Sequence, residues 1–171
     1  YLKSLYKDRY IFCEKPPVNN RRQLSDLKTL NTKKIYFNYN FRFFKIAEIL
    51  QKRESYKMGK LIYANLLASQ GLAKKKQYKT NWRSNFKKCP KGIYEIVSNY
   101  YIDLINYLFE IFKIEKPTLI NSLNTGNSFD TSHVKIRLRN KGLINIFSTY
   151  NSAYSKSLFF YCLIKIKLLS N

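Results

Sequence analysis

The sequence predicts a mainly α fold, namely a small helical domain with one basic β-hairpin and an extended N-terminal arm. Apolar residues recur at helical spacing in several stretches beyond residue 41. One stretch, near residue 135, instead alternates apolar and charged residues at the period of a strand. The first 40 residues show neither period. We therefore expect an arm at 1–40 and a helical domain at 41–171.

The arm is basic and aromatic and surrounds Pro16-Pro17. It carries the cation pairs Arg21-Arg22 and Lys33-Lys34, and its last part continues into the ring-rich stretch "KKIYFNYNFRFF" at 33–44. Exposure of so many aromatic rings to water is unfavourable, and we therefore expect this segment to be buried against a partner.

Four helices are expected in the domain. The first begins at Phe43, with Ile46, Ala47 and Leu50 following at i+3, i+4 and i+7. The second covers 56–70 and ends at Gly71. Its inner stripe consists of Met58, Leu61, Ile62 and Leu66.

The third helix, from Ile93 to Ile111, has the cleanest apolar face and is stopped by Pro117. The fourth begins at about Ser155. The residues that it directs inward are Leu158, Phe159, Cys162, Leu163 and Ile166.

A basic loop at 72–92 separates the second and third helices and contains "KKKQYKTNWRSNFKK". No acidic residue occurs between Ser55 and Tyr94. Lysines neutralise phosphates and flat rings stack on unpaired bases, which favours RNA contact. The alternative for the rings, to which we give equal weight, is a stripe packed on the core.

The stretch "HVKIRLRNKGLINIF" predicts a hairpin at 133–148. Alternation places Val134, Ile136 and Leu138 on one side and cations on the other, and Asn140-Lys141-Gly142 suits a turn with positive φ. A hairpin with one cationic face fits an RNA groove. The alternatives are an ordinary surface hairpin or the end of a helix at Arg139.

These three segments supply the expected RNA-binding residues. They are Arg21, Arg22, Lys33, Lys34, Lys74, Lys75, Lys76, Tyr78, Lys79, Trp82, Arg83, Lys87, Lys88, Lys135, Arg137, Arg139 and Lys141.

Catalytic chemistry has no visible location. The single histidine, His133, has no neighbouring thiol or carboxylate pair, and Cys13, Cys89 and Cys162 are far apart in the sequence. No phosphate-binding loop, G-x-G-x-x-G or H-E-x-x-H motif occurs. We therefore expect no catalytic residues, no metal site, no cofactor and no enzymatic activity.

Charge and composition point to a polyanionic partner. The 32 Lys and Arg residues against 10 Asp and Glu give a net charge of +22. Residues with A+T-rich codons are abundant, as in the 15 Tyr and 12 Phe against 5 Gly and 4 Pro, which suggests an organellar genome. The longest apolar run, at 157–164, is far shorter than the ~20 residues of a spanning helix.

Two stretches resemble the small-subunit ribosomal protein family conventionally numbered seven. "FKIAEILQKRESYKMGKLIYANLL" at 44–67 is similar to its first two helices, and "IEKPTL" at 114–119 to the proline after its third. The C-terminal residues Arg139-Asn140 and Ser155-Lys156 are also similar to the family numbered eight. The first resemblance implies a helical fold whose protruding hairpin binds ribosomal RNA.

The sequence thus favours a structural constituent of the mitochondrial ribosome, specifically of its small subunit, located in the mitochondrial matrix. Its partners would be ribosomal RNA and neighbouring ribosomal proteins, with no small-molecule substrate and no membrane span. The alternative is an accessory subunit of an inner-membrane respiratory complex. A nuclease or RNA-modifying enzyme would require an acidic cluster or metal motif that the sequence lacks.

Overall fold

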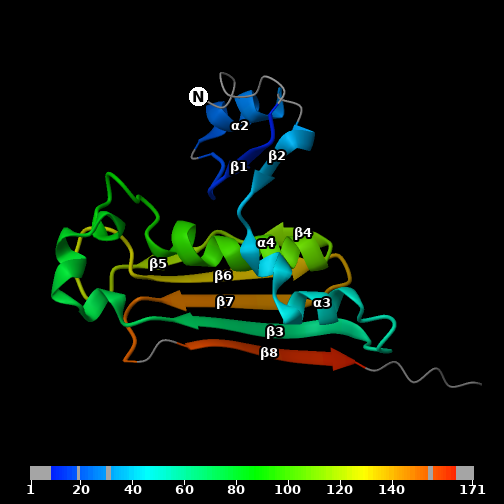
Figure 1. The fold of residues 1–171 in the computed structure, drawn as a ribbon. Coiled ribbons are helices and arrows are strands. Elements are labelled where there is room, and N and C mark those ends of the chain that lie inside the picture. Colours follow the sequence, from blue (N-terminus) through cyan, green and yellow to red (C-terminus); the bar gives the residue numbers. More distant parts are fainter. Residues whose placement is uncertain (1–8, 19, 30–31, 154–155, 165–171) are drawn as a thin grey trace, which may run out of the picture. The chain divides into compact units, whose positions relative to one another are not determined.

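The computed structural model describes residues 9–18, 20–29, 32–153 and 156–164, and it is an α/β fold with two sheets (Figure 1). The chain forms two compact units, 1–40 and 41–171. The expected mainly α fold is therefore wrong. Among the helices that the structure describes, none has the length and hydropathy needed to cross a membrane.

The first unit is a small strand–helix–strand arrangement. Strands β1 (Ile11–Cys13) and β2 (Ile35–Phe37) pair in parallel, and α2 (Arg21–Lys28) and the 3₁₀ turn η1 (Thr32–Lys34) lie between them in sequence. Asn20 caps α2 by accepting a 2.9 Å hydrogen bond from the backbone N–H of Gln23. The expected extended arm is corrected accordingly: short elements of three to eight residues leave no visible period.

The second unit contains a six-stranded mixed sheet in the order β4-β6-β7-β3-β8, with β5 also pairing with β6. The bounds of the strands are β3 (Lys60–Ser69), β4 (Ile111–Ile114), β5 (Thr118–Ile120), β6 (Thr131–Leu138), β7 (Leu143–Thr149) and β8 (Lys156–Ile164). Only β3 and β7 pair in parallel within the described sheet.

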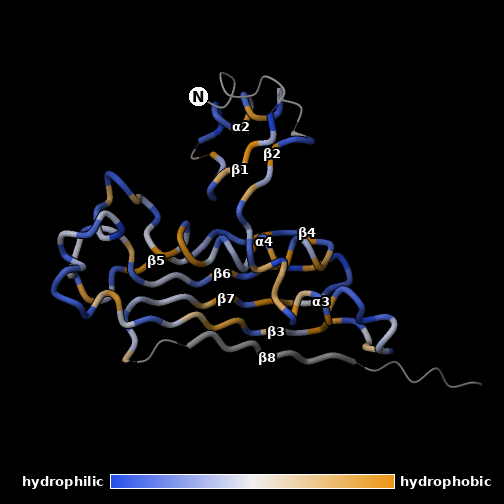
Figure 2. The backbone as a smooth tube through the Cα atoms, viewed as in Figure 1, coloured by the Kyte–Doolittle hydropathy of each residue, from blue (hydrophilic) through white to orange (hydrophobic). Residues whose placement is uncertain are grey.

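Helices cover one face of this sheet. These are the 3₁₀ turn η2 (Asn40–Phe43), α3 (Lys45–Gln51), and the π-helix η6 (Tyr94–Ser98), which continues into α4 (Asn99–Leu108). Tyr101 and Ile105 of α4 pack on the sheet, and Leu104 packs against α3. Figure 2 shows the apolar stretches of β3, β7 and α4 that form this core.

The hairpin predicted at 133–148 forms β6 and β7, but these strands lie inside the sheet and do not protrude. Val134, Ile136 and Leu138 are buried beneath the helices, whereas Lys135 and Arg137 are exposed on the opposite face. Both hairpin strands have further neighbours in the sheet. β6 also pairs with β4 and with β5, whereas β7 also pairs with β3. A protruding hairpin that enters RNA is therefore excluded by the topology.

The expected helix at 56–70 is wrong because most of it is strand β3. A bulge between Leu61 and Tyr63 shifts the pairing register by one residue. Leu61 is buried before the bulge, and Ala64 and Leu66 are buried after it. The apolar spacing of three and two residues around the bulge resembles a helical stripe, which explains the error.

The expected C-terminal helix is also wrong. Residues 156–164 form β8, which pairs antiparallel with β3. A short apolar run does not distinguish a buried strand from a helix by periodicity. Ser155 and Ile166, which were assigned to that helix, lie outside the described residues.

Three buried serines connect η6 to the sheet. The Oγ atom of Ser98 lies 2.8 Å from Oγ of Ser132 on β6 and donates over 3.0 Å to Oγ of Ser148 on β7. All three side chains are completely buried. Small hydroxyl side chains let the helix approach the strands closely while their polar groups satisfy one another.

We predict that neighbouring residues on β6 differ sharply in their effect on stability. Ile136→Ala should lower the free energy of unfolding by about 2–5 kcal/mol, because it opens a cavity beneath α4. Lys135→Ala, on the exposed face, should change it by less than about 0.5 kcal/mol. Urea unfolding followed by circular dichroism measures both. Equal losses would contradict the assignment of the two faces.

Candidate functional site

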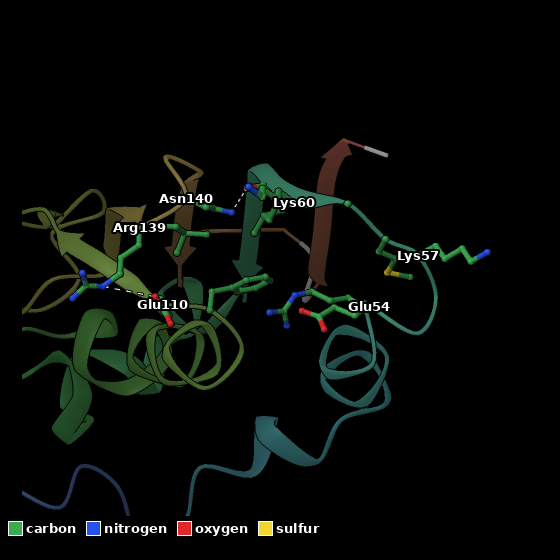
Figure 3. A pocket seen from close by; sticks show the side chains of 12 residues that line it. Glu54, Lys57, Lys60, Glu110, Arg139 and Asn140 are labelled. Atoms are coloured by element: carbon green, nitrogen blue, oxygen red, sulfur yellow. Dashed lines mark hydrogen bonds and ion pairs between the residues drawn. The ribbon is translucent and has the colours of Figure 1, made fainter. Parts of the chain in front are cut away.

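A cavity of about 720 Å³ lies where three chain connections meet at one end of the sheet (Figure 3). These are the turn from α3 to β3, the turn from α4 to β4, and the turn between β6 and β7. The volume is within the range of small-molecule sites in proteins. We call this cavity the cationic pocket.

The lining of the pocket combines apolar side chains with an excess of positive charge. Leu61, Phe109 and Leu138 are among the apolar residues. Four cations and two carboxylates also belong to the lining. They are Arg53, Lys57, Lys60, Arg139, Glu54 and Glu110. Such a lining favours an anion over a cation or a purely apolar ligand.

Arg53 is held in place by the ends of both helices. Its Nη1 atom donates 3.2 Å hydrogen bonds to the carbonyl oxygens of Leu50 and Leu108. Its guanidinium carbon lies 5.3 Å from the centre of the Phe109 ring, which is a cation–π contact. The position of this cation is therefore fixed by the fold before any ligand binds.

The β6–β7 turn is fixed to β3. The side-chain amide of Asn140 donates to the carbonyl of Leu61 at 3.2 Å and accepts from the N–H of Gly142 at 2.9 Å. A side chain at residue 142 would collide with the Leu61 carbonyl, so glycine is required there. Lys141 adopts a φ of 68°, as the sequence allowed for this turn. Arg139 consequently stays at the pocket rim, 3.8 Å from Glu110.

The cations expected on the hairpin separate into two groups. Lys135 and Arg137 lie on the exposed sheet face, where Nε of Arg137 donates to Glu115 at 2.8 Å. This bond holds the pKa of Glu115 below its ordinary value. Arg139 lines the cationic pocket, and Lys141 lines a neighbouring hollow of about 530 Å³ with Arg137 and Arg139.

The cations expected in the loop lie far from this pocket in sequence and do not line it. The loop forms the 3₁₀ turns η3 (Leu72–Lys74), η4 (Lys76–Thr80) and η5 (Trp82–Ser84). The lysines of the predicted set are all exposed. They are Lys74, Lys75, Lys76, Lys79, Lys87 and Lys88. In the first unit, Arg21, Arg22 and Lys33 are exposed and Lys34 is half-buried.

The two rings of the loop have different environments. Trp82 is 43% exposed, and the guanidinium of Arg83 lies 4.4 Å from its ring centre. Tyr78 is buried, with its ring 5.9 Å from that of Tyr150. Burial, followed by the charge of Asp130, raises the pKa of Tyr78 to about 12. Tyr78 therefore belongs to the core of this loop.

No metal centre is found among the described residues, because they contain no group of three suitable ligands. Cys89 is buried, and desolvation followed by a hydrogen bond with Glu95 raises the pKa of its thiol to about 12. The thiol is thus protonated near neutral pH and a poor nucleophile.

Most residues of the pocket are absent from the set predicted from the sequence. Arg53, Glu54, Lys57 and Lys60 belong to the stretch "QKRESYKMGK", whose pattern predicts the end of one helix and the start of another. The available signal was the density of charge at a boundary between elements. Glu110 gave no signal, because its partner Arg139 lies on a different element.

Solved structures with the same fold include NAD-linked oxidoreductases. The chain is similar to levoglucosan dehydrogenase in complex with NADH and levoglucosan, with a TM-score of 0.75 and 18% identity over 89% of this chain and 45% of that chain. An inositol dehydrogenase homolog from Azotobacter vinelandii, complexed with NAD⁺, has a TM-score of 0.75 and 14% identity over 91% and 43%. The fold is one that oxidoreductases contain.

An NAD binding oxidoreductase from Klebsiella pneumoniae is also similar, with a TM-score of 0.74 and 12% identity over 86% of this chain and 43% of that chain. The chain therefore spans less than half the length of these structures. No family model matches the sequence, and neither does any curated protein.

These comparisons overturn the ribosomal interpretation. The resemblances to ribosomal families seven and eight are wrong, because the structural relatives are dehydrogenases and the helices that carried the resemblance at 56–70 and after 155 are strands. The expected role as a ribosomal constituent is therefore wrong, and so is the alternative role as a respiratory-complex subunit. The expected ribosomal partners and the expected absence of enzymatic activity are contradicted by the same structures. The mitochondrial location stays a prediction.

We predict opposite effects for two buried tyrosine hydroxyls. The hydroxyl of Tyr78 has no hydrogen-bond partner among the described residues, so Tyr78→Phe should leave stability unchanged or raise it by up to about 1 kcal/mol. Tyr150 is hydrogen-bonded to Arg83, so Tyr150→Phe should cost about 1–2 kcal/mol. Thermal unfolding compares them. A larger loss for Tyr78→Phe would show that this hydroxyl is satisfied.

We also predict that Arg137→Ala raises the pKa of Glu115 toward its ordinary value of 4.5. A depressed pKa in the folded state favours folding above the unfolded pKa, and this contribution disappears as the pH falls through the folded value. Carboxyl NMR titration measures the shift. Lys113→Ala is the control and should have a smaller effect, since Lys113 acts only through its charge. An unchanged Glu115 pKa in Arg137→Ala would disprove the pairing.

Proposed function

We propose that this chain forms the substrate-side part of an NAD-linked oxidoreductase that acts on small hydroxylated molecules. The observation that supports the proposal is the structural similarity over 89% of this chain to 45% of levoglucosan dehydrogenase. That enzyme has been solved with NADH together with levoglucosan, and also with L-sorbose. Its ligands are therefore a dinucleotide and a small carbohydrate.

The pairing of the sheet argues that the dinucleotide binds elsewhere. Dinucleotide-binding folds use an open, mostly parallel sheet with a G-x-G-x-x-G turn between the first strand and its helix. Of the five pairings in the described sheet of the second unit, only β3–β7 is parallel. The sequence contains no such glycine motif. We therefore assign the cofactor to a different part of the enzyme.

The chemistry divides accordingly. Oxidation of an alcohol transfers a hydride from carbon to the nicotinamide, while a base removes the hydroxyl proton. The cofactor supplies the hydride acceptor, and the protein positions the alcohol against it. In this proposal the helix-covered sheet is the rigid support from which the connecting loops hold the alcohol.

The proposal predicts selective ligand binding by the purified 171-residue chain. An anhydrosugar, a hexose or a cyclitol should raise its melting temperature, because a ligand that binds only the native state stabilises it. NADH at ~0.15 M salt should show no saturable binding below about 1 mM. Differential scanning fluorimetry and nicotinamide fluorescence make these measurements.

A set of neutral molecules without hydroxyl groups, at the same concentrations, is the control for solvent effects. If no hydroxylated ligand is distinguished from this set, the substrate-side assignment is wrong. Saturable NADH binding with enhanced fluorescence would place the cofactor on this chain and contradict the division of roles.

A further inference from the structure

We propose that the cationic pocket binds a small phosphorylated molecule that carries hydroxyl groups, with Arg53 receiving the phosphate. The inference goes beyond the proposed function, because it requires neither a dinucleotide nor redox chemistry. It rests on the orientation of one guanidinium group, the charge around it and the size of the cavity.

Arg53 offers an anion the free edge of a fixed guanidinium. Its Nη1 atom is occupied by the carbonyls of Leu50 and Leu108, so the ends of α3 and α4 set the plane of the group. Among the described residues, no acceptor contacts its Nε or Nη2 atom. These two nitrogens form the side of arginine that pairs with two oxygens of an oxyanion.

The surrounding charges strengthen the case for a dianion. The pocket has four cations against two carboxylates. Within the described part of the chain, Lys57 and Lys60 form no ion pair, and the Arg139 contact with Glu110 is 3.8 Å long. In Figure 3, Lys57 extends away from the other labelled side chains. Exposed lysines change rotamer within nanoseconds, so Lys57 is able to turn toward a ligand.

The shape of the pocket requires more than a bare phosphate. A volume of about 720 Å³ leaves room beside an anion on Arg53, and Leu61, Phe109 and Leu138 supply apolar lining for the rest of a ligand. Glu54 and Glu110 would repel a second anionic group but accept hydrogen bonds from hydroxyls. A phosphorylated sugar or polyol combines these properties.

Isothermal titration calorimetry at ~0.15 M salt tests the inference with three probes. They are a hexose 6-phosphate, the same hexose without phosphate, and inorganic phosphate. The phosphorylated hexose should bind at least about tenfold more tightly than either of the others, because only it engages both Arg53 and the carboxylates.

Two variants identify the site, and one serves as a matched control. Arg53→Lys retains a cation that can donate to the helix carbonyls but lacks the planar fork, and it should weaken binding of the phosphorylated hexose about tenfold. Lys57→Gln with Lys60→Gln should weaken it to a similar extent. Lys113→Gln with Lys135→Gln removes the same charge from outside the pocket, and its effect should stay within about twofold.

Circular dichroism of each variant establishes that it is folded, and the lysine pair keeps the test valid if Arg53→Lys is not. Absence of millimolar binding, equal affinity for inorganic phosphate, or an equal loss in the control pair would each overturn the inference. The titrations contain no NADH, and the hexose without phosphate is their only unphosphorylated sugar. Failure here therefore leaves the oxidoreductase proposal intact, and failure of that proposal leaves this one intact.

Discussion

Burial of one face of a mixed sheet beneath α4 is the constraint on which the second unit depends. Ile136 and Ile146 are completely inaccessible to solvent there, and Tyr101 and Ile105 of α4 cover them. Because side chains alternate along a strand, this burial also decides that Lys135 and Arg137 face water. The charge pattern of the exposed face is thus a consequence of the core and does not by itself imply a nucleic-acid partner.

The same packing positions the functional region. Leu50 near the end of α3 and Leu108 at the end of α4 pack in one buried cluster, so both carbonyls lie within reach of Arg53, which lines the pocket. Carbonyl groups at helix C-termini lack intrahelical partners, and Arg53 satisfies one on each helix. A structural requirement of the helices therefore leaves a fixed cation at the mouth of a cavity.

The sequence predicted those elements whose period is undisturbed. The alternation in 134–138 marked both faces of β6, and the apolar spacing from Ile93 onward marked the helix that becomes η6 and α4. β3 was misread because the bulge at Leu61 imitates helical spacing. β8 was misread because an apolar run pairs with a strand almost ninety residues away, which no local pattern records.

The pocket could not be predicted from local sequence patterns for the same reason. Its residues come from three connections that are far apart in the sequence and that only the sheet brings together. The net charge of +22 was visible, but charge alone does not specify a partner. Most of the predicted cations are exposed, where salt screens them within about 10 Å. Arg53 differs because its orientation is set by hydrogen bonds before a ligand arrives, which reduces the entropy lost on binding. Selectivity for an anion therefore depends on this preorganised group, and the total charge contributes mainly to long-range attraction.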